Sequence, residues 1–260
     1  TYRDGENREY QARTDGKVIL AAGSLVTPQL LMLSGVGPAD QLRSHGITPV
    51  ADLPGVGEHL VDHPEVPMIA TANGLHGYYK QGVGWRMIRN GLRFKLFGAG
   101  PILSAGVEAG AFVNPADPGN MPLVSPNLLQ HPADVQTMIA GQRFFLRAFA
   151  TSPLKERIRA VAIPDPTDPG DEAILRHCKR FVKTNYHPAG TCRTGPPGYG
   201  MAVLDSRLRV RGIEHLRVCD LSAMPDINAG NTNAPAMMLG SRCAEFISGK
   251  AEAHPLGPPG

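Results

Sequence analysis

The stretch that decides the fold runs from residue 17 to residue 37 and reads KVILAAGSLVTPQLLMLSGVG. Its apolar start leads into a turn of small residues, which predicts a buried strand over 17–23. Thr27 and Pro28 predict the start of a helix, because a threonine hydroxyl can cap a helix and proline fits the first helical position. The apolar helix that follows is expected to stop at Gly35. A strand, a small-residue turn and a helix in this order are typical of a nucleotide-binding unit.

Apolar periodicity and turn residues predict the other elements. The expected helices cover 40–45, 84–97, 132–160, 171–184 and 234–248, and the expected strands cover 103–113, 208–211 and 216–218. Asn233 is expected to cap the last helix, and Gly249 is expected to end it. The 30 glycines and 24 prolines predict many turns and long connections between these elements.

The composition is that of an ordinary globular protein with one or two domains. The 260 residues can bury a large core, and 42% of them are hydrophobic. A net charge of +3 without a basic arm argues against a nucleic-acid partner. No apolar run approaches the ~20 residues that cross a bilayer, so no membrane span is expected. The start of the chain shows no signal-peptide core and the four cysteines form no CxxC pair, which favours reduced thiols and a cytoplasmic location.

The generic catalytic and metal-binding signatures are absent from the sequence. Gly-x-Gly occurs five times, but no copy has the third glycine that completes a dinucleotide fingerprint. The chain has neither a GxSxG elbow nor an HExxH zinc helix. His59 and His63 are four residues apart, but Gly57 and Pro64 disfavour the helix that would align them, and a third ligand is missing. We interpret this segment as a polar turn and expect no metal site.

Longer segments resemble the glucose–methanol–choline (GMC) oxidoreductase family. Residues 23–37 are similar to the family's second signature and are followed, as in that family, by LPGVGEHLVDHP at 53–64. The sequence NYHPAGTC at 185–192 resembles the family's active-site histidine segment. Residues 203–235 resemble its closing flavin-contact segment. Within the family, the chain is most similar to choline dehydrogenase-like and alcohol dehydrogenase-like flavoenzymes.

The resemblance implies an α/β fold, in which an FAD-binding Rossmann-like domain of the GMC type carries an inserted substrate domain of mixed or antiparallel sheet and helices. The implied domains are part of the FAD-binding domain at 1–64, the substrate-binding domain at 65–184, the return of the FAD-binding domain with the active site at 185–249, and a tail at 250–260. The family's N-terminal phosphate-binding fingerprint is missing, and the substrate domain is expected to be shortened near 114–122. We therefore expect a C-terminal piece of an enzyme that works with an N-terminal chain or half.

The resemblance also implies the chemistry, which is the FAD-dependent oxidation of a small-molecule alcohol to an aldehyde or ketone. His187 is implied to take the hydroxyl proton, and a neutral imidazole suits that step at neutral pH. Asn231 matches the family's second catalytic position. An amide there can donate to the developing alkoxide and orient the carbon for hydride transfer to the flavin.

The implied FAD contacts come from three short segments. They are Ala22 and Gly23 near the adenosine half, Asp220 and Leu221 near the ribityl chain and pyrophosphate, and Asn231, Thr232 and Asn233 at the flavin ring. The last segment opens the helix expected at 234–248, and a helix N-terminus carries about half a positive charge and free N–H groups. Such a helix end, aimed at the N1 and C2-carbonyl edge of the ring, favours flavin reduction.

Two other interpretations of the sequence stay open. One is a hydroxynitrile lyase-like FAD protein, which resembles these oxidases but shows no net redox turnover. A flavin that no alcohol reduces would indicate this second class. The other is a non-catalytic remnant that acts as a binding module, and it would fail to hold FAD even when the N-terminal half is present.

Overall fold

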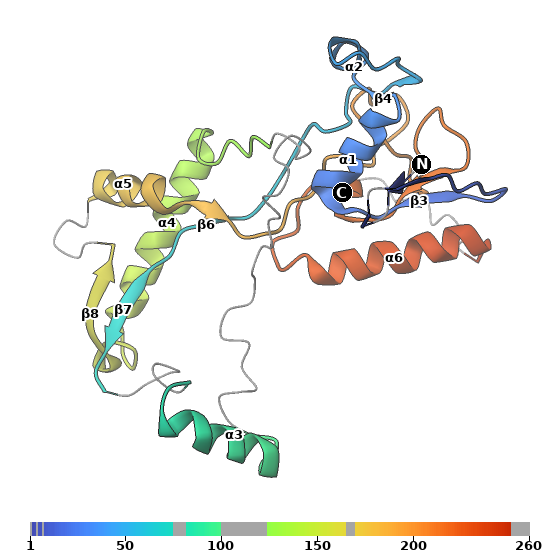
Figure 1. Ribbon diagram of the computed structural model, residues 1–260. Coiled ribbons are helices and arrows are strands. Elements are labelled where there is room, and N and C mark those ends of the chain that lie inside the picture. Colours follow the sequence, from blue (N-terminus) through green and yellow to red (C-terminus); the bar gives the residue numbers. More distant parts are fainter. Residues whose placement is uncertain are drawn as a thin grey trace. The chain divides into compact units, whose positions relative to one another are not determined.

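Figure 1 shows the computed structural model of the chain, which describes residues 2–3, 5–6, 8–74, 82–99, 124–164 and 170–250. The chain divides into two compact units. Unit 1 comprises Thr1–His63, Pro118–Pro126 and His187–Gly260, and unit 2 comprises Pro64–Asp117 and Asn127–Tyr186. The expected strand at 103–113, the expected shortening near 114–122 and residues 251–260 of the expected tail lie outside the described residues. The assignment of a cofactor domain and a substrate domain stays a prediction.

In its described residues, unit 1 combines short strands with helices. The strands are β1 (Tyr2–Arg3), β2 (Glu9–Tyr10), β3 (Val18–Leu20), β4 (Val36–Gly37), β5 (Ala51–Asp52) and β10 (Leu216–Val218), and the helical segments are α1 (Gly23–Leu33), α2 (Ala39–Ser44), the 3-10 turn η4 (Leu221–Ala223) and α6 (Asn233–Ser248). β3 pairs with β10 in parallel, β4 pairs with β5 in parallel, and β1 pairs with β2 antiparallel. The β3–β10 pair therefore joins the two ends of the chain, as the nucleotide-binding interpretation expects.

The expected strand over 17–23 is shorter and more exposed than the sequence suggests. β3 has three residues, and Val18 and Ile19 remain 46% and 44% exposed. The prediction of a buried strand is therefore wrong for this structure. Within the described residues β3 also has only one paired edge, to β10.

The predicted start of α1 is also wrong, because the helix begins at Gly23, four residues before Thr27. Pro28 lies inside the helix and has no N–H to donate to the carbonyl of Ser24. The hydroxyl of Thr191 donates to this buried carbonyl instead, at 2.6 Å. A side chain from a distant segment thus satisfies the backbone group that the proline leaves free, and the helix continues to Leu33.

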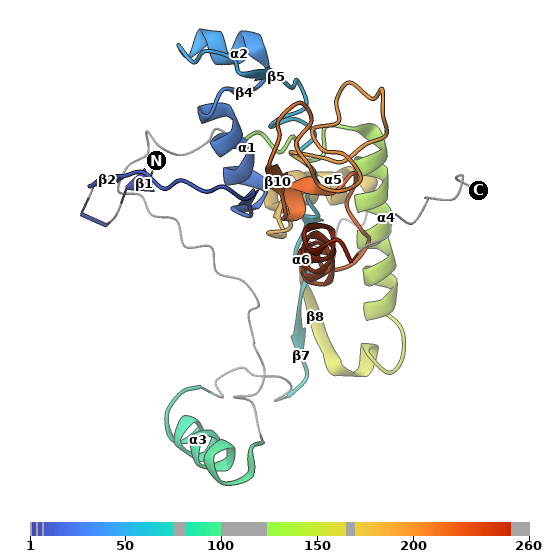
Figure 2. The ribbon, with the colours of Figure 1, turned by 90° about the vertical axis from the view of Figure 1, so that its right-hand side faces the viewer.

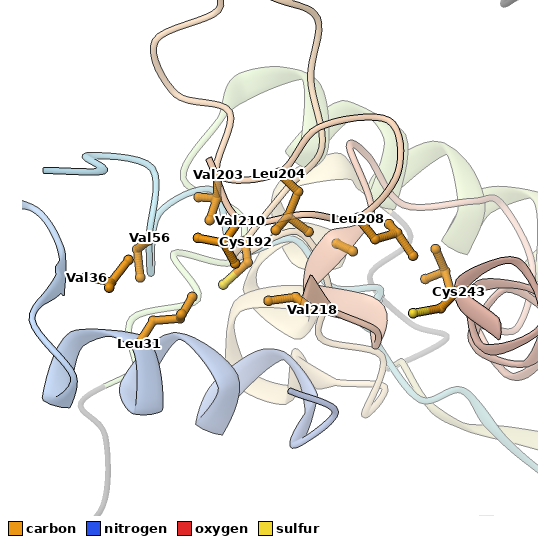
Figure 3. Packing of buried hydrophobic residues seen from close by; sticks show 12 residues of the cluster. Leu31, Val36, Val56, Cys192, Val203, Leu204, Leu208, Val210, Val218 and Cys243 are labelled. Atoms are coloured by element: carbon orange, nitrogen blue, oxygen red, sulfur yellow. The ribbon is translucent and has the colours of Figure 1, made fainter. Parts of the chain in front are cut away.

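The core of unit 1 collects apolar side chains from α1, α6, β10 and the loops between them. Figure 3 shows Leu31 of α1 facing Val36, Val56 and Cys192, with Val218 of β10 to the right of them. The buried members of this cluster are Leu31, Val36, Val56, Cys192, Val203, Leu204, Leu208, Val210, Val218, Ala223, Leu239 and Cys243. All four cysteines of the chain, Cys178, Cys192, Cys219 and Cys243, are free thiols, as the sequence analysis expects.

The segment from 189 to 194 is the centre of unit 1, because its backbone is hydrogen-bonded on both sides. On one side Val61 and Ala189 exchange two N–H···O bonds of 3.0 and 2.9 Å, and the N–H of Gly57 donates to the carbonyl of Thr191 at 2.9 Å. On the other side the N–H groups of Gly190, Cys192 and Thr194 donate to the carbonyls of Leu221, Ser222 and Ala223 at 3.1, 2.8 and 3.0 Å. This central segment therefore fixes the loop before residue 63 and the η4 turn in one register.

Gly190 shows how closely these segments approach each other. Its φ is +85°, and a Cβ atom at this position would lie 2.7 Å from the carbonyl oxygen of His59. Any other residue would clash with backbone and strain the left-handed conformation. Glycine is therefore required at this point of the central segment.

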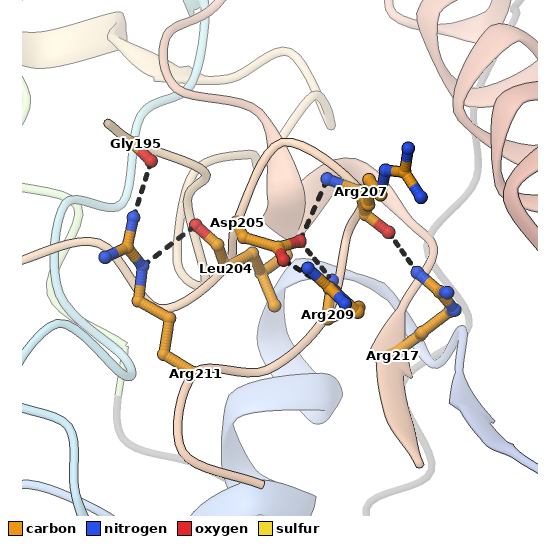
Figure 4. A network of polar contacts seen from close by, with 7 residues as sticks. All are labelled: Gly195, Leu204, Asp205, Arg207, Arg209, Arg211 and Arg217. Atoms are coloured by element: carbon orange, nitrogen blue, oxygen red, sulfur yellow. Dashed lines mark hydrogen bonds and ion pairs between the residues drawn. The ribbon is translucent and has the colours of Figure 1, made fainter. Parts of the chain in front are cut away.

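A polar network holds the loop that leads into β10 (Figure 4). The carboxylate of Asp205 accepts from the N–H groups of Arg207 and Arg209, both at 2.9 Å, and from the Arg209 guanidinium at 2.6 Å. Burial raises the pKa of Asp205, but these hydrogen bonds and the charge of Arg209 outweigh it, and the pKa is lowered. Arg211 donates to the carbonyl of Gly195 at 2.7 Å, and Arg217 donates to the carbonyl of Arg207. The loop is thus tied by charge-assisted bonds at both ends.

Unit 2 consists of antiparallel strand pairs and helices, the type of architecture expected for the inserted segment. Its elements are β6 (Pro64–Glu65), β7 (Ile69–Ala72), α3 (Trp85–Phe97), α4 (Pro132–Phe149), the 3-10 turn η3 (Lys155–Arg157), β8 (Ile158–Ile163), α5 (Asp171–Phe181) and β9 (Lys183–Thr184). β6 pairs with β9, and β7 pairs with β8 in the ribbon visible in Figure 2. α4 and α5 pack together around the buried side chains of Leu129, Ile174 and Cys178.

Two helix predictions in unit 2 extend too far. The helix expected at 132–160 ends at Phe149, because Pro153 follows shortly afterwards and the alternating IRAVAI of 158–163 forms β8. The helix expected at 171–184 ends at Phe181, and the next residues pair in β9. In both places, pairing with a strand distant in sequence overrides local periodicity.

Local sequence signals predict several other helices and strands correctly. The structure confirms α2, α3, β10 and the end of α6 at Gly249, which has φ +72°. Residues 208–211 form no named strand, but Arg209 bridges to Arg217 and Leu204 bridges to Val210. None of the described helices combines the length and the hydropathy needed to cross a bilayer. The cytoplasmic location stays a prediction.

The proline inside α1 gives a testable double-mutant cycle. We expect Thr191→Val to lower the free energy of unfolding by about 1–3 kcal/mol, because the buried carbonyl of Ser24 loses its donor. Pro28→Ala restores an N–H four residues after Ser24, so Thr191→Val should cost about 1 kcal/mol less in that background. Chemical denaturation of the four proteins measures both costs. Equal costs in the two backgrounds would contradict this role of the Thr191 hydroxyl.

Candidate active site

His187 lies two residues before the central segment, and its backbone and both ring nitrogens have partners. Its N–H donates to the carboxylate of Asp62 at 3.0 Å. Nδ1 lies 2.9 Å from Nδ1 of His63, and Nε2 lies 3.3 Å from the side-chain nitrogen of Asn231. The ring is half-buried. The structure thus brings together His187 and Asn231, the two residues that the sequence analysis expects to form the catalytic pair.

Asn231 is held by the start of α6. Its Oδ1 accepts the N–H of Asn233 at 2.8 Å, so its NH2 group turns toward His187. The predicted cap is therefore wrong, because Asn233 is the first residue of the helix and Asn231 satisfies its N–H. Thr232, between them, is buried with 4% exposure. The need to cap a free helix N–H fixes the orientation of the Asn231 amide.

Asp220 joins the end of β10 to the start of α1. One carboxylate oxygen accepts the N–H of Gly23 at 3.0 Å and the hydroxyl of Thr27 at 2.6 Å. The other oxygen accepts the N–H of Ser222 at 2.8 Å. The N–H of Ala22 donates to the same threonine hydroxyl at 3.1 Å. Both oxygens of Asp220 are therefore engaged by the protein, and this carboxylate caps α1 from a distant segment.

The predicted site residues fall into two groups within unit 1. Ala22, Gly23, Asp220 and Leu221 form one group, and His187, Asn231, Thr232 and Asn233 form the other. The central segment links the groups, because it begins beside His187 and the N–H of Gly190 donates to the carbonyl of Leu221. The side chain of Asp220 therefore belongs to the group at the start of α1, and the side chain of His187 belongs to the group at the start of α6.

The sequence analysis missed three residues around His187. Asp62 and His63 hold its backbone and its ring, and the carbonyl of Asn228 lies 2.8 Å from Nε2 of His63. The sequence signal was available, because the DHP end of the segment at 53–64 belongs to the family resemblance. Among the described residues, no group of three or more His, Cys, Asp or Glu side chains is placed to hold a metal ion.

Cys192 lies in the central segment but is not a nucleophile. Burial raises the pKa of its thiol to about 12, and the charge of Asp220 also raises it. A thiol reacts as its thiolate, so Cys192 is unreactive near neutral pH. Its role is to fill the core of unit 1.

The polar network of Figure 4 borders a cavity of about 820 Å³. Its lining includes Lys17, Arg207, Arg209 and Arg217 together with Asp205. None of the residues predicted for catalysis or FAD contact lines it. This cavity is therefore separate from the catalytic candidates.

Comparison with known proteins identifies the family. Family models described as GMC oxidoreductase match residues 1–65 and 112–240, which together make up most of the chain. The chain belongs to the GMC oxidoreductase family. The sequence resemblance and the expected α/β fold of the GMC type are thereby confirmed.

Relatives in the family are oxidoreductases. The chain is 33% identical to alcohol dehydrogenase [acceptor] of Pseudomonas putida, over 96% of this chain and 55% of that protein. It is 32% identical to choline oxidase of Arthrobacter globiformis, over 94% of this chain and 50% of that protein. The chain spans about half the length of the curated relatives it matches. These alignments extend over 308 and 286 residues, so the relatives carry residues within the matched span that the 260-residue chain lacks.

A solved structure shares the fold. Formate oxidase from Aspergillus oryzae RIB40, a protein in which FAD modification has been studied, matches with a TM-score of 0.82. The match covers 95% of this chain and 56% of that chain at 22% sequence identity. At this identity the likeness establishes the fold.

Asp220 gives a second prediction. Asp220→Ala should lower the free energy of unfolding by about 2–3 kcal/mol, because the N–H of Gly23 and the buried hydroxyl of Thr27 lose a charged acceptor. Asp15→Ala, at an exposed carboxylate, is the matched control and should change it by less than about 0.5 kcal/mol. Chemical denaturation compares the two variants. A loss as small as that of the control would show that Asp220 does not hold α1.

Proposed function

We propose that this chain is the part of an FAD-dependent alcohol-oxidising enzyme that carries the catalytic pair, His187 and Asn231. One observation supports the proposal above the others: Nε2 of His187 and Nδ2 of Asn231 lie 3.3 Å apart on side chains that are not fully buried. A proton acceptor and a hydrogen-bond donor at this spacing can contact the same substrate oxygen. FAD, when bound, supplies the acceptor for the hydride that leaves the alcohol carbon.

His187 and Asn231 have different roles toward the alcohol oxygen. The hydroxyl donates its hydrogen bond to Nε2 of His187, which takes the proton as a general base. The NH2 group of Asn231 donates to the same oxygen and stabilises the negative charge that develops there. Two fixed contacts to one oxygen also orient the adjacent carbon, which lowers the entropic part of the barrier.

The residues around the pair fit a flavin. Within the described residues, Oδ1 of Asn228 is buried without a hydrogen-bond partner, and other atoms of Asn228 contact His63 and Asn231. This oxygen can therefore accept a hydrogen bond from a ligand group that bears an N–H. The isoalloxazine ring carries such a group. The N-terminus of α6, at Thr232 and Asn233, carries about half a positive charge, which favours the negative charge of a reduced flavin. We assign Asn231, Thr232 and Asn233 to the contact with the ring.

The second group of predicted residues is proposed to contact the rest of FAD. Ala22 and Gly23 form the turn between β3 and α1, and this turn is assigned to the adenosine half. Asp220 and Leu221 are assigned to the ribityl chain and pyrophosphate side. Since the carboxylate of Asp220 already accepts three protein hydrogen bonds, its main contribution is to hold the shape of this turn.

The domain roles and the partner follow from the same proposal. Unit 1 carries all the predicted site residues and is proposed as part of the FAD-binding domain, and unit 2 as the substrate-binding domain. The chain spans about half the length of its relatives and lacks a complete phosphate-binding fingerprint. Activity is therefore proposed to need a complementary N-terminal half, with a small-molecule alcohol as the substrate.

A visible absorption spectrum tests the proposed function. The protein is purified natively with any co-purifying chain, and alcohols are added anaerobically. Flavin bands are expected, and at least one alcohol is expected to bleach them. Bands that no alcohol bleaches would favour a lyase-like FAD protein. The absence of flavin, even with the N-terminal half present, would favour a binding module without catalysis.

The catalytic pair gives a separate prediction. His187→Ala should slow flavin reduction by about 100-fold or more and leave FAD bound, because the general base is lost. Anaerobic stopped-flow spectroscopy measures the rate, and the flavin spectrum measures occupancy. His45→Ala, at an exposed histidine of unit 1, is the matched control and should leave the rate unchanged. A His187→Ala protein that reduces its flavin at the normal rate would remove His187 from this role.

A further inference from the structure

We propose that His63 is a positioning residue that fixes the tautomer of His187, so that Nε2 of His187 is the nitrogen that accepts the proton; this inference rests on the proposed function. The argument begins at Asn228, whose backbone carbonyl oxygen lies 2.8 Å from Nε2 of His63. A carbonyl oxygen only accepts hydrogen bonds, so Nε2 of His63 carries a hydrogen. In the neutral ring the other nitrogen, Nδ1, then has a free lone pair.

The lone pair of His63 determines the state of His187. The two Nδ1 atoms lie 2.9 Å apart, which is the distance of a hydrogen bond. Because Nδ1 of His63 accepts, Nδ1 of His187 must donate. The neutral ring of His187 therefore carries its hydrogen on Nδ1, and its Nε2 is left as the base.

The other end of the network leads to the same tautomer independently. Oδ1 of Asn231 accepts the N–H of Asn233, so the NH2 group of Asn231 is the group 3.3 Å from Nε2 of His187. A hydrogen on this Nε2 would set two donors against each other. The bare Nε2 that His63 imposes is thus the form that Asn231 requires.

The backbone holds the two rings at the angle that this bond needs. Their planes are perpendicular, at 88°, with ring centroids 5.1 Å apart. Asp62 accepts the N–H of His187, and the preceding residue, Val61, is paired with Ala189. Two consecutive residues, Asp62 and His63, therefore hold the backbone and the ring of His187.

This contact has a chemical consequence beyond orientation. When His187 accepts the alcohol proton at Nε2, its ring becomes positively charged. The bond from its Nδ1–H to His63 becomes charge-assisted and stabilises this state. The Nε2–H of His63 stays bonded to the carbonyl of Asn228, so Nδ1 of His63 remains the acceptor of this bond. Loss of the acceptor lets His187 adopt the other tautomer, in which Nε2 is no longer a base.

Two variants of His63 separate the acceptor from the shape of the ring. His63→Phe keeps a ring but has no acceptor, and His63→Asn loses the ring but can place an amide oxygen near the position of Nδ1. Both are examined in the natively purified protein, with any co-purifying chain, after selective 15N labelling of histidine. The nitrogen spectrum of the ring reports which nitrogen of His187 carries the hydrogen, and a His187→Gln protein assigns its signal.

The wild type and His63→Asn are expected to show His187 with its hydrogen on Nδ1. His63→Phe is expected to shift His187 toward the other tautomer. In the same protein, flavin reduction at saturating alcohol should fall by about 10- to 100-fold, while the alcohol concentration for half-saturation changes by less than about 3-fold. His63→Asn should recover most of the rate.

Three results would overturn the proposal: a hydrogen on Nε2 of His187 in the wild type, an unchanged tautomer in His63→Phe, or equal rate losses in both variants. A wild type whose flavin no alcohol bleaches would refute the proposed function. The nitrogen spectra would still decide the tautomer, so the two failures are distinguishable.

Discussion

The central segment at 189–194, bonded through its backbone on both sides, is the constraint on which the rest of unit 1 depends. Its buried N–H and C=O groups need partners, and the segments at 57–61 and 221–223 supply them. Gly190 permits the close approach because it has no side chain. His187 lies two residues before this segment, and contacts to the side chains of Asp62 and His63 hold its backbone and its ring.

The sequence predicts a helix or strand well where residues close in the chain determine it. A left-handed glycine ends α6, and basic amphipathic periodicity marks α3. It predicts the bounds of an element poorly where a group distant in sequence determines them. The start of α1 depends on Asp220 and on the hydroxyl of Thr191, which is 167 residues from the carbonyl it serves, and neither is visible in local propensity. The sequence predicts a helix that extends into β8, because the partner of β8, the strand β7, lies in another part of the chain.

The same distinction applies to the site. His187 and Asn231 came from the family resemblance, and the structure brings them within 3.3 Å; their catalytic roles stay a proposal. The sequence analysis interprets the segment around His63 as a polar turn, because the role of His63 depends on a carbonyl 165 residues later. A histidine with one carbonyl partner and one imidazole partner has a determined tautomer, and that information is present only in three dimensions. Local sequence rules describe a residue type, whereas the fold decides which of its atoms is an acid or a base.

β3 illustrates a different kind of dependence. It is a three-residue strand with two half-exposed apolar side chains, and among the described strands it pairs with β10 alone. A two-stranded sheet is only marginally stable by itself, and an open apolar edge is a template for pairing with other chains. Whatever covers this edge therefore protects the chain against aggregation as well as completing its sheet. If the N-terminal half that the proposed function requires covers this edge, solubility during production, and not only cofactor retention, reports its presence.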